Sequence, residues 1–292
     1  MSLSWTEEPA AHAAQIYTES DELADSVAAY FAAGFEEGEP AILVATATHT
    51  SLVLEHLAAA GWDAKRIDAL GLLLSADADS TLQQLMDGQV PRNAAFERII
   101  GGLLDELEGR FPETRVRVYG EMVDVLCQRG QQSAAVALEE LWNCLARTRR
   151  FALLCGYRLD VFDRQSQVAT LRDVCNLHTH VAAGADDDHL AHAVDDALVG
   201  VLGAQGAGQV YSLIGPEIRE RRVPPPQLAL MWVSENMPMN AERILTAARS
   251  RYADKPASIA PTATVAAARP RRPDPDALRA LLRKATRTRR LS

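Results

Sequence analysis

The sequence predicts a three-layer α/β domain with a parallel sheet, followed by an all-α C-terminal region. Short apolar segments of strand type alternate with helical segments of ten or more residues from about residue 10 to residue 165. This alternation is typical of right-handed βαβ units. The run "PAILVAT" is a short, fully apolar segment, as expected for a strand in a parallel sheet covered on both faces. Strand patterns then stop, and helical periodicity continues to residue 252.

The first half of the chain supplies two strands and their helices. Residues 20–37 carry apolar side chains at helical spacing, with Ser20 as the predicted N-cap and Gly38 at the end. The run "PAILVAT" predicts the first strand, "HTSLVLEHLAAAG" the helix after it, and "GLLLSA" the second strand. Helices are predicted for residues 78–87 and 92–110.

The second half supplies two more strands and then only helices. "RVRVYG" predicts a strand, "EMVDVLCQRG" a short helix, "SAAVALEELWNCLAR" a longer helix, and "FALLCGY" the last strand. Trp142 lies on the apolar stripe of the longer helix and is expected in the core. Beyond this strand, helices are predicted for residues 165–181, 187–203, 206–221 and 226–252.

Composition divides the chain into four segments. We predict an α/β domain over residues 1–181, a helical domain over 182–252, a Pro/Ala-rich linker over 253–275 and a basic helix over 276–292. The net charge of −9 conceals an asymmetry, because residues 253–292 carry ten basic and three acidic groups. The acidic body is therefore a poor partner for nucleic acid, whereas the basic tail leaves an acidic protein, nucleic acid or a membrane surface open.

The overall composition is that of a globular protein from a reducing compartment. Apolar residues make up 48% of the chain and charged residues 24%. No apolar run approaches the roughly 20 residues that cross a bilayer, and no secretory signal is visible. The four cysteines show no CxxC spacing. We therefore expect a cytoplasmic protein without a transmembrane segment, bound metal or cofactor.

The turn after the first predicted strand argues against nucleotide hydrolysis. A phosphate cradle normally needs glycines that let backbone amides converge, a lysine, and a Ser or Thr for magnesium. The turn here reads "ATATHTS", with neither glycine nor lysine. Glu121, at the exit of "RVRVYG", is therefore not expected to serve nucleotide chemistry.

A ligand site is nevertheless expected beyond the carboxyl ends of the parallel strands. The side chains predicted there are Thr46, Thr48, His49, Tyr119, Glu121, Cys155 and Tyr157. This mixture suits a small organic molecule or a soft metal better than a polyphosphate. The competing interpretations are a helix N-terminal carboxylate for Glu121, stabilised by ~0.3–1 kcal/mol, and a small buried apolar residue for Cys155.

A separate group of histidines and a cysteine raises a zinc hypothesis. The group comprises Cys175, His178, His180, His189 and His192. Neither spacing within it matches a zinc signature, and "AAGADDD" separates its two halves. Surface histidines near an acidic helix start are the favoured interpretation.

Two C-terminal segments are candidates for the output of the protein. "ALMWVSENMPMNAERIL" superficially suggests a helix-turn-helix, but Met–Pro–Met is a poor tight turn and the second helix has few base-reading side chains. The basic helix is marginal alone and would order on a partner, the alternative being a solvated tail. Its predicted partner contacts are Leu278, Arg279, Leu282, Arg283, Lys284 and Arg287.

Several motifs in order carry a family resemblance. They are "HAAQIY", "FEEGEPAILVAT", "RVYGEMVDVL", "ALEELWNCLAR", "FALLCGYRLDVF" and "LRDVCNLHTHV", within about residues 10–180. This arrangement resembles the MEDS domain, a sensory domain of regulators in methanogens and methylotrophs. The resemblance implies a fold similar to RecA/KaiC-type ATPases without the phosphate loop, and a role in sensing small hydrocarbon-derived ligands. Matching positions are His12, Tyr17, Glu121, Trp142, Cys155 and Tyr157.

The resulting hypothesis is a non-enzymatic regulatory protein. It senses a small organic ligand at the strand ends and relays occupancy to a protein partner through the helical region or the tail. A homodimer is compatible with the apolar helical faces. The alternatives are an enzyme that uses Glu121 and His49 as acid/base groups, a scaffold with a vestigial pocket, and a DNA-associated transcriptional regulator.

Overall fold

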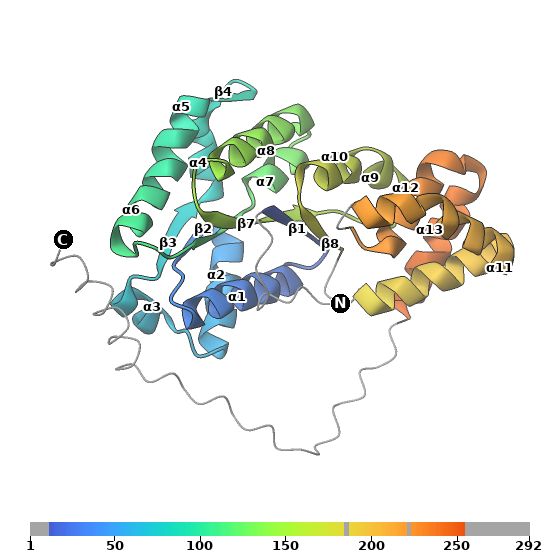
Figure 1. Ribbon diagram of the computed structural model, residues 1–292, viewed down its shortest axis with the longest axis horizontal. Coiled ribbons are helices and arrows are strands. Elements are labelled where there is room, and N and C mark those ends of the chain that lie inside the picture. The colour runs from blue at the N-terminus through green and yellow to red at the C-terminus, as the bar shows by residue number, and fades with distance from the viewer. Residues whose placement is uncertain (1–11, 184–186, 221–222, 255–292) are drawn as a thin grey trace, which may run out of the picture.

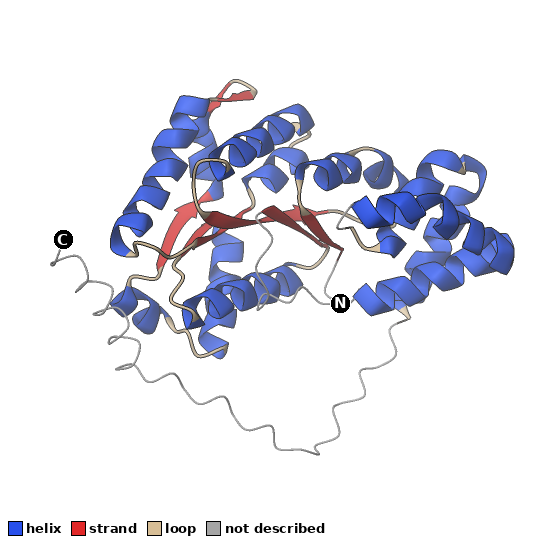
Figure 2. Cartoon of the chain, viewed as in Figure 1, coloured by secondary structure: helices blue, strands red, loops and turns tan. Residues whose placement is uncertain are grey.

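The computed structural model describes residues 12–183, 187–220 and 223–254. It shows an α/β unit, with a sheet between two layers of helices, and a helical region packed at one end of the sheet (Figures 1 and 2). The predicted basic helix, with its contact residues Leu278, Arg279, Leu282, Arg283, Lys284 and Arg287, lies outside the described residues, as does nearly all of the predicted linker.

The sheet has six parallel strands in the order β3-β2-β6-β7-β1-β8, which confirms the predicted fold class. Four of these strands match the apolar runs in the sequence. The strands are β1 (His12–Tyr17), β2 (Ala41–Ala45), β3 (Leu73–Asp77), β6 (Val116–Gly120), β7 (Phe151–Arg158) and β8 (His180–Ala183).

Two strands of this six-stranded sheet, β1 and β8, were not predicted from the sequence. β1 is buried at every position, but His12 and Gln15 interrupt its apolar pattern. β8 has four residues and pairs only with β1 at the edge of the sheet. The prediction that "FALLCGY" was the last strand is therefore wrong, and the helix predicted for residues 165–181 ends early so that β8 can form.

Helices cover both faces of the sheet (Figure 1). One face carries α1 (Ser20–Glu36) and α2 (Ala47–Ala59), with α3 (Ala64–Leu70) beside them. The other carries α4 (Ala78–Leu85), α5 (Asn93–Phe96), the π-helical turn η1 (Glu97–Gly101), α6 (Gly102–Arg110), α7 (Met122–Gln128), α8 (Gln132–Ala146), α9 (Arg164–Val168) and α10 (Thr170–Leu177). A small hairpin of β4 (Met86–Asp87) and β5 (Val90–Pro91) joins α4 to α5.

Each face of the sheet has its own buried core. Trp142 of α8 is fully buried, as predicted, and packs edge-on against Phe96 with ring centroids 4.9 Å apart. On the opposite face Arg117 is buried beneath α1, where its Nε lies 2.6 Å from Glu39 Oε2. Gly34 of α1 makes room for it, because a Cβ at that position would lie 2.5 Å from Arg117 Nε.

The C-terminal region is all helical, as predicted. It consists of α11 (Asp187–Glu220), α12 (Pro225–Asn236) and α13 (Pro238–Ala253). The stretch Asp188–Pro216 is long and apolar enough to cross a membrane by length and composition alone. However, Gly203 has φ 75° and ψ 165°, which breaks α11 into two helices. Each is shorter than the roughly 20 residues that span a bilayer.

Candidate functional site

The structure distributes the predicted site residues over two faces of the sheet. Side chains alternate between faces along a strand, and Cys155 and Tyr157 lie within β7 rather than after it. These two side chains face the layer that contains α8. Tyr119 of β6 points to the opposite layer, where its hydroxyl would lie 2.5 Å from a Cβ at Gly156. The single predicted pocket is therefore two separate polar clusters.

The first cluster surrounds Glu121, whose side chain is buried beside the N-terminus of α2. Its Oε1 accepts a hydrogen bond from the backbone N–H of Thr46. Its Oε2 lies 2.6 Å from His49 Nδ1 and 3.2 Å from the Tyr119 hydroxyl, which donates to it. The Nε2 of His49 lies 3.0 Å from Ser20 Oγ. We call these five residues the Glu121 cluster.

The Glu121 carboxylate is fully engaged by these contacts. Burial alone would raise the pKa of Glu121, but the hydrogen bonds from His49 and Thr46 and the charge of His49 outweigh it and hold the pKa below its usual value. Because Thr46 is the N-cap of α2, Glu121 ties this helix to the end of β6. Thr48 is exposed on the first turn of α2 and is not one of the groups that hold Glu121.

Tyr17 borders the Glu121 cluster and belongs to a neighbouring carboxylate. Its hydroxyl donates to Asp124 Oδ2 at 3.0 Å, and its ring lies edge-on to His49 with centroids 5.7 Å apart. Asp124 also accepts the Arg158 backbone N–H at 2.9 Å. Burial raises the pKa of Asp124. The sequence analysis did not single out this residue.

The second cluster joins four buried side chains from four elements. His12 comes from β1, Glu139 from α8, Cys155 from β7, and His178 follows α10. One imidazole, carboxylate or thiol atom from each lies within 4.8 Å of all the others. The Nε2 of His12 lies 3.4 Å from Cys155 Sγ and 3.1 Å from Glu139 Oε2. We call these four residues the His12 cluster.

Surrounding groups fix the orientation of both imidazoles in the His12 cluster. The Nδ1 of His178 lies 2.7 Å from the Val174 carbonyl oxygen, which can only accept, so this nitrogen carries the proton. The Nδ1 of His12 lies 3.0 Å from Asn143 Oδ1. Asn143 in turn donates through Nδ2 to the Leu177 carbonyl at 3.2 Å. The side-chain oxygen of Asn143, rather than its nitrogen, therefore faces His12 and accepts the proton of Nδ1. In the neutral form of each ring, Nε2 therefore carries a lone pair directed into the cluster.

Two atoms of the His12 cluster have no hydrogen-bond partner among the described residues. They are Glu139 Oε2 and His178 Nε2, both in fully buried side chains. An unsatisfied buried polar atom costs about 1–3 kcal/mol. Burial acts to raise the pKa of Glu139, but His178 and His12 outweigh it and hold that pKa below its usual range. Burial, reinforced by Glu139, raises the pKa of the Cys155 thiol.

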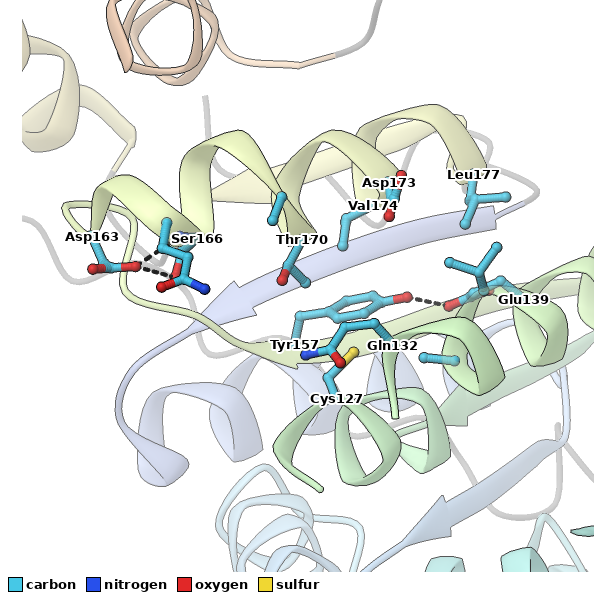
Figure 3. Close-up of a pocket in the computed structure, with 14 residues that line it drawn as sticks. Cys127, Gln132, Glu139, Tyr157, Asp163, Ser166, Thr170, Asp173, Val174 and Leu177 are labelled. Carbon is cyan, nitrogen blue, oxygen red and sulfur yellow. Dashed lines mark hydrogen bonds between the residues drawn. The ribbon is translucent and has the colours of Figure 1, made fainter. Parts of the chain in front are cut away.

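A cavity of about 500 Å³ opens between α8 and the pair α9–α10, beside the His12 cluster. Figure 3 shows the Tyr157 ring between α8 and the pair α9–α10, with its hydroxyl donating to Glu139. Three carboxyl groups line the cavity, and none of its 14 lining residues is Lys or Arg. Its lining residues include Cys127, Ala135, Val136, Glu139, Tyr157, Asp163, Thr170, Asp173, Val174 and Leu177. An anionic ligand would meet no compensating charge there.

The helices α9 and α10 that border this cavity also contact the C-terminal helical region. Gln167 Oε1 accepts from Gln227 Nε2 at 2.8 Å, and both side chains are completely buried. Arg164 donates to the Ser234 carbonyl, with both contacts at 3.3 Å. Further contacts join Arg172 to Glu235 at 2.7 Å and Cys175 Sγ to Met231 Sδ at 3.9 Å.

The interpretation of residues 175–192 as a surface group is wrong for His178. Its side chain is completely buried because the end of α10 turns it back under the helix toward β7. The rest of the group does not assemble around it. Cys175 packs on Met231, His189 Nε2 lies 2.9 Å from the Tyr252 carbonyl, and His192 Nδ1 donates to the Asp188 carbonyl.

Glu139 and Ser20 belong to these clusters and Asn143 orients His12, but none of the three was among the site residues predicted from the sequence. Glu139 offered a signal, because it stands between Leu138 and Trp142 on the apolar stripe of α8. A carboxylate on such a stripe is rarely buried without a charged or metal partner. Ser20 was noted only as a helix cap, and its pairing with His49 depends on the packing of α1 against α2.

The comparison with known families supports a sensory domain. The comparison with curated proteins gives no match. The family model for MEDS, described as the MEthanogen/methylotroph, DcmR Sensory domain, matches residues 11–179, which is more than half of the chain. The matched stretch runs from β1 past α10 and contains all four residues of the His12 cluster. The chain therefore belongs to the MEDS family of sensory domains.

Proposed function

We propose that the cavity between α8 and α9–α10 binds a small organic molecule, and that its occupancy is relayed to the C-terminal helical region. The observation that carries this proposal is that one pair of helices has both roles. α9 and α10 line the cavity, and the same two helices contact α12. The protein is then a non-enzymatic sensor.

The lining of the cavity sets the class of ligand. Its volume of about 500 Å³ lies within the range of cavities that enclose small organic ligands. Apolar walls from Ala135, Val136 and Leu177 provide most of the contact, and the polar groups that orient a ligand are Thr170 and Tyr157. Since the charged lining groups are all acidic, the ligand is neutral or cationic. Small hydrocarbon derivatives such as alcohols, aldehydes and amines fit this description.

The buried contact between α9 and α12 supplies a means of relay. Gln167 and Gln227 form a completely buried amide pair, yet Gln227 Oε1 has no partner among the described residues, and neither has Ser234 Oγ nearby on α12. A buried interface whose polar atoms are not all hydrogen-bonded is less stable than an apolar interface. A rearrangement of α9 against α12 therefore costs less free energy. A ligand that binds more tightly to one packing of α9–α10 then shifts the equilibrium by that difference in affinity.

The receiver of the signal is proposed to be a protein partner that recognises the helical region or the basic tail. Regulation of transcription through such a partner and a cytoplasmic location remain parts of this proposal. The acidic body favours a protein partner over direct contact with nucleic acid.

A thermal-shift screen of the full chain against short alcohols, aldehydes and alkylamines tests the proposal. Saturable stabilisation by one class is expected, by about 2.7 kcal/mol at a hundredfold excess over Kd. The substitution Val136→Trp should abolish this shift by filling the cavity. Ser133→Trp, at an exposed position on the same helix that does not line the cavity, is the matched control and should retain it. Equal shifts in both variants would contradict the cavity assignment.

A hydrolase is the second candidate, because of the Glu121 cluster. Ser20 Oγ, His49 and Glu121 are arranged as nucleophile, base and orienting acid, with Nε2 toward the hydroxyl and Nδ1 toward the carboxylate. The acidic side chains of Asp21 and Glu22 follow Ser20 directly and disfavour a developing oxyanion there. This places hydrolysis second. Turnover of a chromogenic acetate ester that is lost in Ser20→Ala would reverse the ranking.

A further inference from the structure

We propose that the four residues of the His12 cluster bind a single zinc ion in tetrahedral coordination. The ligand atoms are Nε2 of His12 and of His178, Sγ of Cys155, and a carboxylate oxygen of Glu139. This inference goes beyond the sensing role, and it stands whether or not the neighbouring cavity binds an organic molecule.

Three distances within the cluster are close to those between neighbouring ligands in a tetrahedral zinc site. Metal–ligand bonds of about 2.0–2.3 Å place tetrahedral ligands about 3.3 Å apart for N/O pairs and about 3.6 Å apart for N/S pairs. In the cluster, His12 Nε2 lies 3.1 Å from Glu139 Oε2 and 3.4 Å from Cys155 Sγ. His178 Nε2 lies 3.4 Å from Glu139 Oε1. One candidate ligand atom from each of the four residues lies within 4.8 Å of all the others, so a small shift of the side chains would let them share one metal ion.

The tautomers of the two imidazoles are those that a metal requires. Each Nδ1–H is held by an oxygen outside the cluster, from Val174 for His178 and from Asn143 for His12. Metal-binding histidines in proteins have this arrangement, in which a carbonyl or amide oxygen orients the ring and raises the basicity of the other nitrogen. The side chain of Asn143 is itself anchored by the Leu177 carbonyl.

A hydrogen-bond network alone does not satisfy the cluster. Glu139 Oε2 and His178 Nε2 lie close to neighbouring polar atoms, but neither forms a hydrogen bond with any described residue. Tyr157 donates to Glu139 Oε1, and Cys155 is the remaining donor near His12. Lone pairs of Glu139 Oε2 and of neutral His178 Nε2 point into this buried cluster, and a cation between them would satisfy both.

The donor set selects the metal. One thiolate and two imidazoles exclude calcium and magnesium, which prefer oxygen ligands. Two nitrogen, one sulfur and one oxygen ligand in a compact tetrahedron are typical of zinc. Binding releases one proton to solvent, because the Cys155 thiol must lose its proton to form the sulfur–zinc bond.

Direct metal analysis of the full chain tests the site. The protein is stripped with chelator, loaded with zinc or cobalt(II), and freed of excess metal by desalting. We expect about one zinc ion per chain. Cobalt(II) should give the intense visible bands of a tetrahedral site and a near-ultraviolet sulfur-to-metal charge-transfer band.

Variants localise the bound metal. Cys155→Ser should remove the charge-transfer band, and His178→Gln should lower zinc affinity at least tenfold. Cys175→Ser is the matched control, because Cys175 is also buried near α10 but packs on Met231 outside the cluster. It should retain both the metal and the band. Circular dichroism of each variant confirms that it is folded.

A substitution outside the ligand set covers the case in which a ligand variant does not fold. Asn143→Ala leaves all four donor atoms in place and removes only the oxygen that orients His12. Zinc affinity should fall by about 10- to 100-fold. The proposal is overturned if folded wild-type protein retains no zinc after loading. It is also overturned if Cys155→Ser and Asn143→Ala both bind zinc as the wild type does, or if Cys175→Ser loses the charge-transfer band.

Discussion

Replacement of Glu121 by glutamine tests whether this residue is a structural carboxylate. In the wild type its two oxygens accept hydrogen bonds from the Thr46 amide, His49 and the Tyr119 hydroxyl, in a side chain that is 1% exposed. The glutamine amide can keep two of these contacts if His49 changes tautomer. None of the three donors then faces a negatively charged acceptor. Hydrogen bonds to charged groups contribute about 1.5–3 kcal/mol and neutral ones about 0.5–1.5 kcal/mol. We therefore expect Glu121→Gln to lower the free energy of unfolding by about 1–2 kcal/mol at pH 7.

The pH dependence of this difference identifies the charge as its cause. The pKa of Glu121 is lower in the folded protein than in the unfolded chain, so its stabilising contribution is present above the unfolded pKa. It is lost as pH falls through the folded pKa. The gap between wild type and Glu121→Gln should therefore be largest near neutral pH and shrink at pH values below about 4.

Urea denaturation of both proteins at pH 7 and at the lowest pH where both are folded measures the gap. Glu121→Ala serves as the second variant and should cost more, because three donors then lose their acceptor. A Glu121→Gln protein as stable as wild type at pH 7, or a gap that stays constant as pH falls, would show that the charge of Glu121 does not stabilise the fold.

Two further predictions follow from other buried contacts. Gly34→Ala should lower stability by about 1–3 kcal/mol by forcing Arg117 from its position. Gly102→Ala, at an exposed helical position with open space around its Cβ, is the control and should stabilise by up to about 1 kcal/mol in the same denaturation assay. Gln227→Leu should change the free energy of unfolding by less than about 1.5 kcal/mol, because two effects oppose each other. Gln167 Oε1 loses its hydrogen-bond donor, but the unpartnered Gln227 Oε1 is removed from the interior. This substitution should nevertheless weaken any ligand-dependent change in hydrogen exchange at α12.

Much of the fold is predictable from the sequence because four of the six strands in the main sheet are predominantly apolar segments between helical ones. β2, β6 and β7 lie in the middle of the sheet and are buried on both faces, so their composition identifies them. β1 and β8 contain histidine or glutamine and gave no such signal. β1 pairs with β7 and β8 pairs with β1, and local periodicity does not reveal such long-range pairings.

The candidate site was predictable only in part, for the same reason. The resemblance to MEDS singled out His12, Cys155 and Tyr157, but the fold also brings Glu139 and His178 to them. His12 and His178 are 166 positions apart in the sequence. They meet because β1 lies between β7 and β8, which brings both ends of the α/β unit to one place in the sheet. The prediction of a single ligand pocket was also wrong, because Tyr119 and Tyr157 lie on opposite faces of the sheet.

Hydrogen exchange of the full chain, with and without a saturating amount of the best stabilising compound from the screen, tests whether occupancy of the cavity is relayed to the C-terminal helical region. We expect slower exchange in both α9–α10 and α12 when the compound is present, and no change in either segment in Val136→Trp. Protection confined to the neighbourhood of Glu121, or protection of α9–α10 with α12 unaffected, would contradict it.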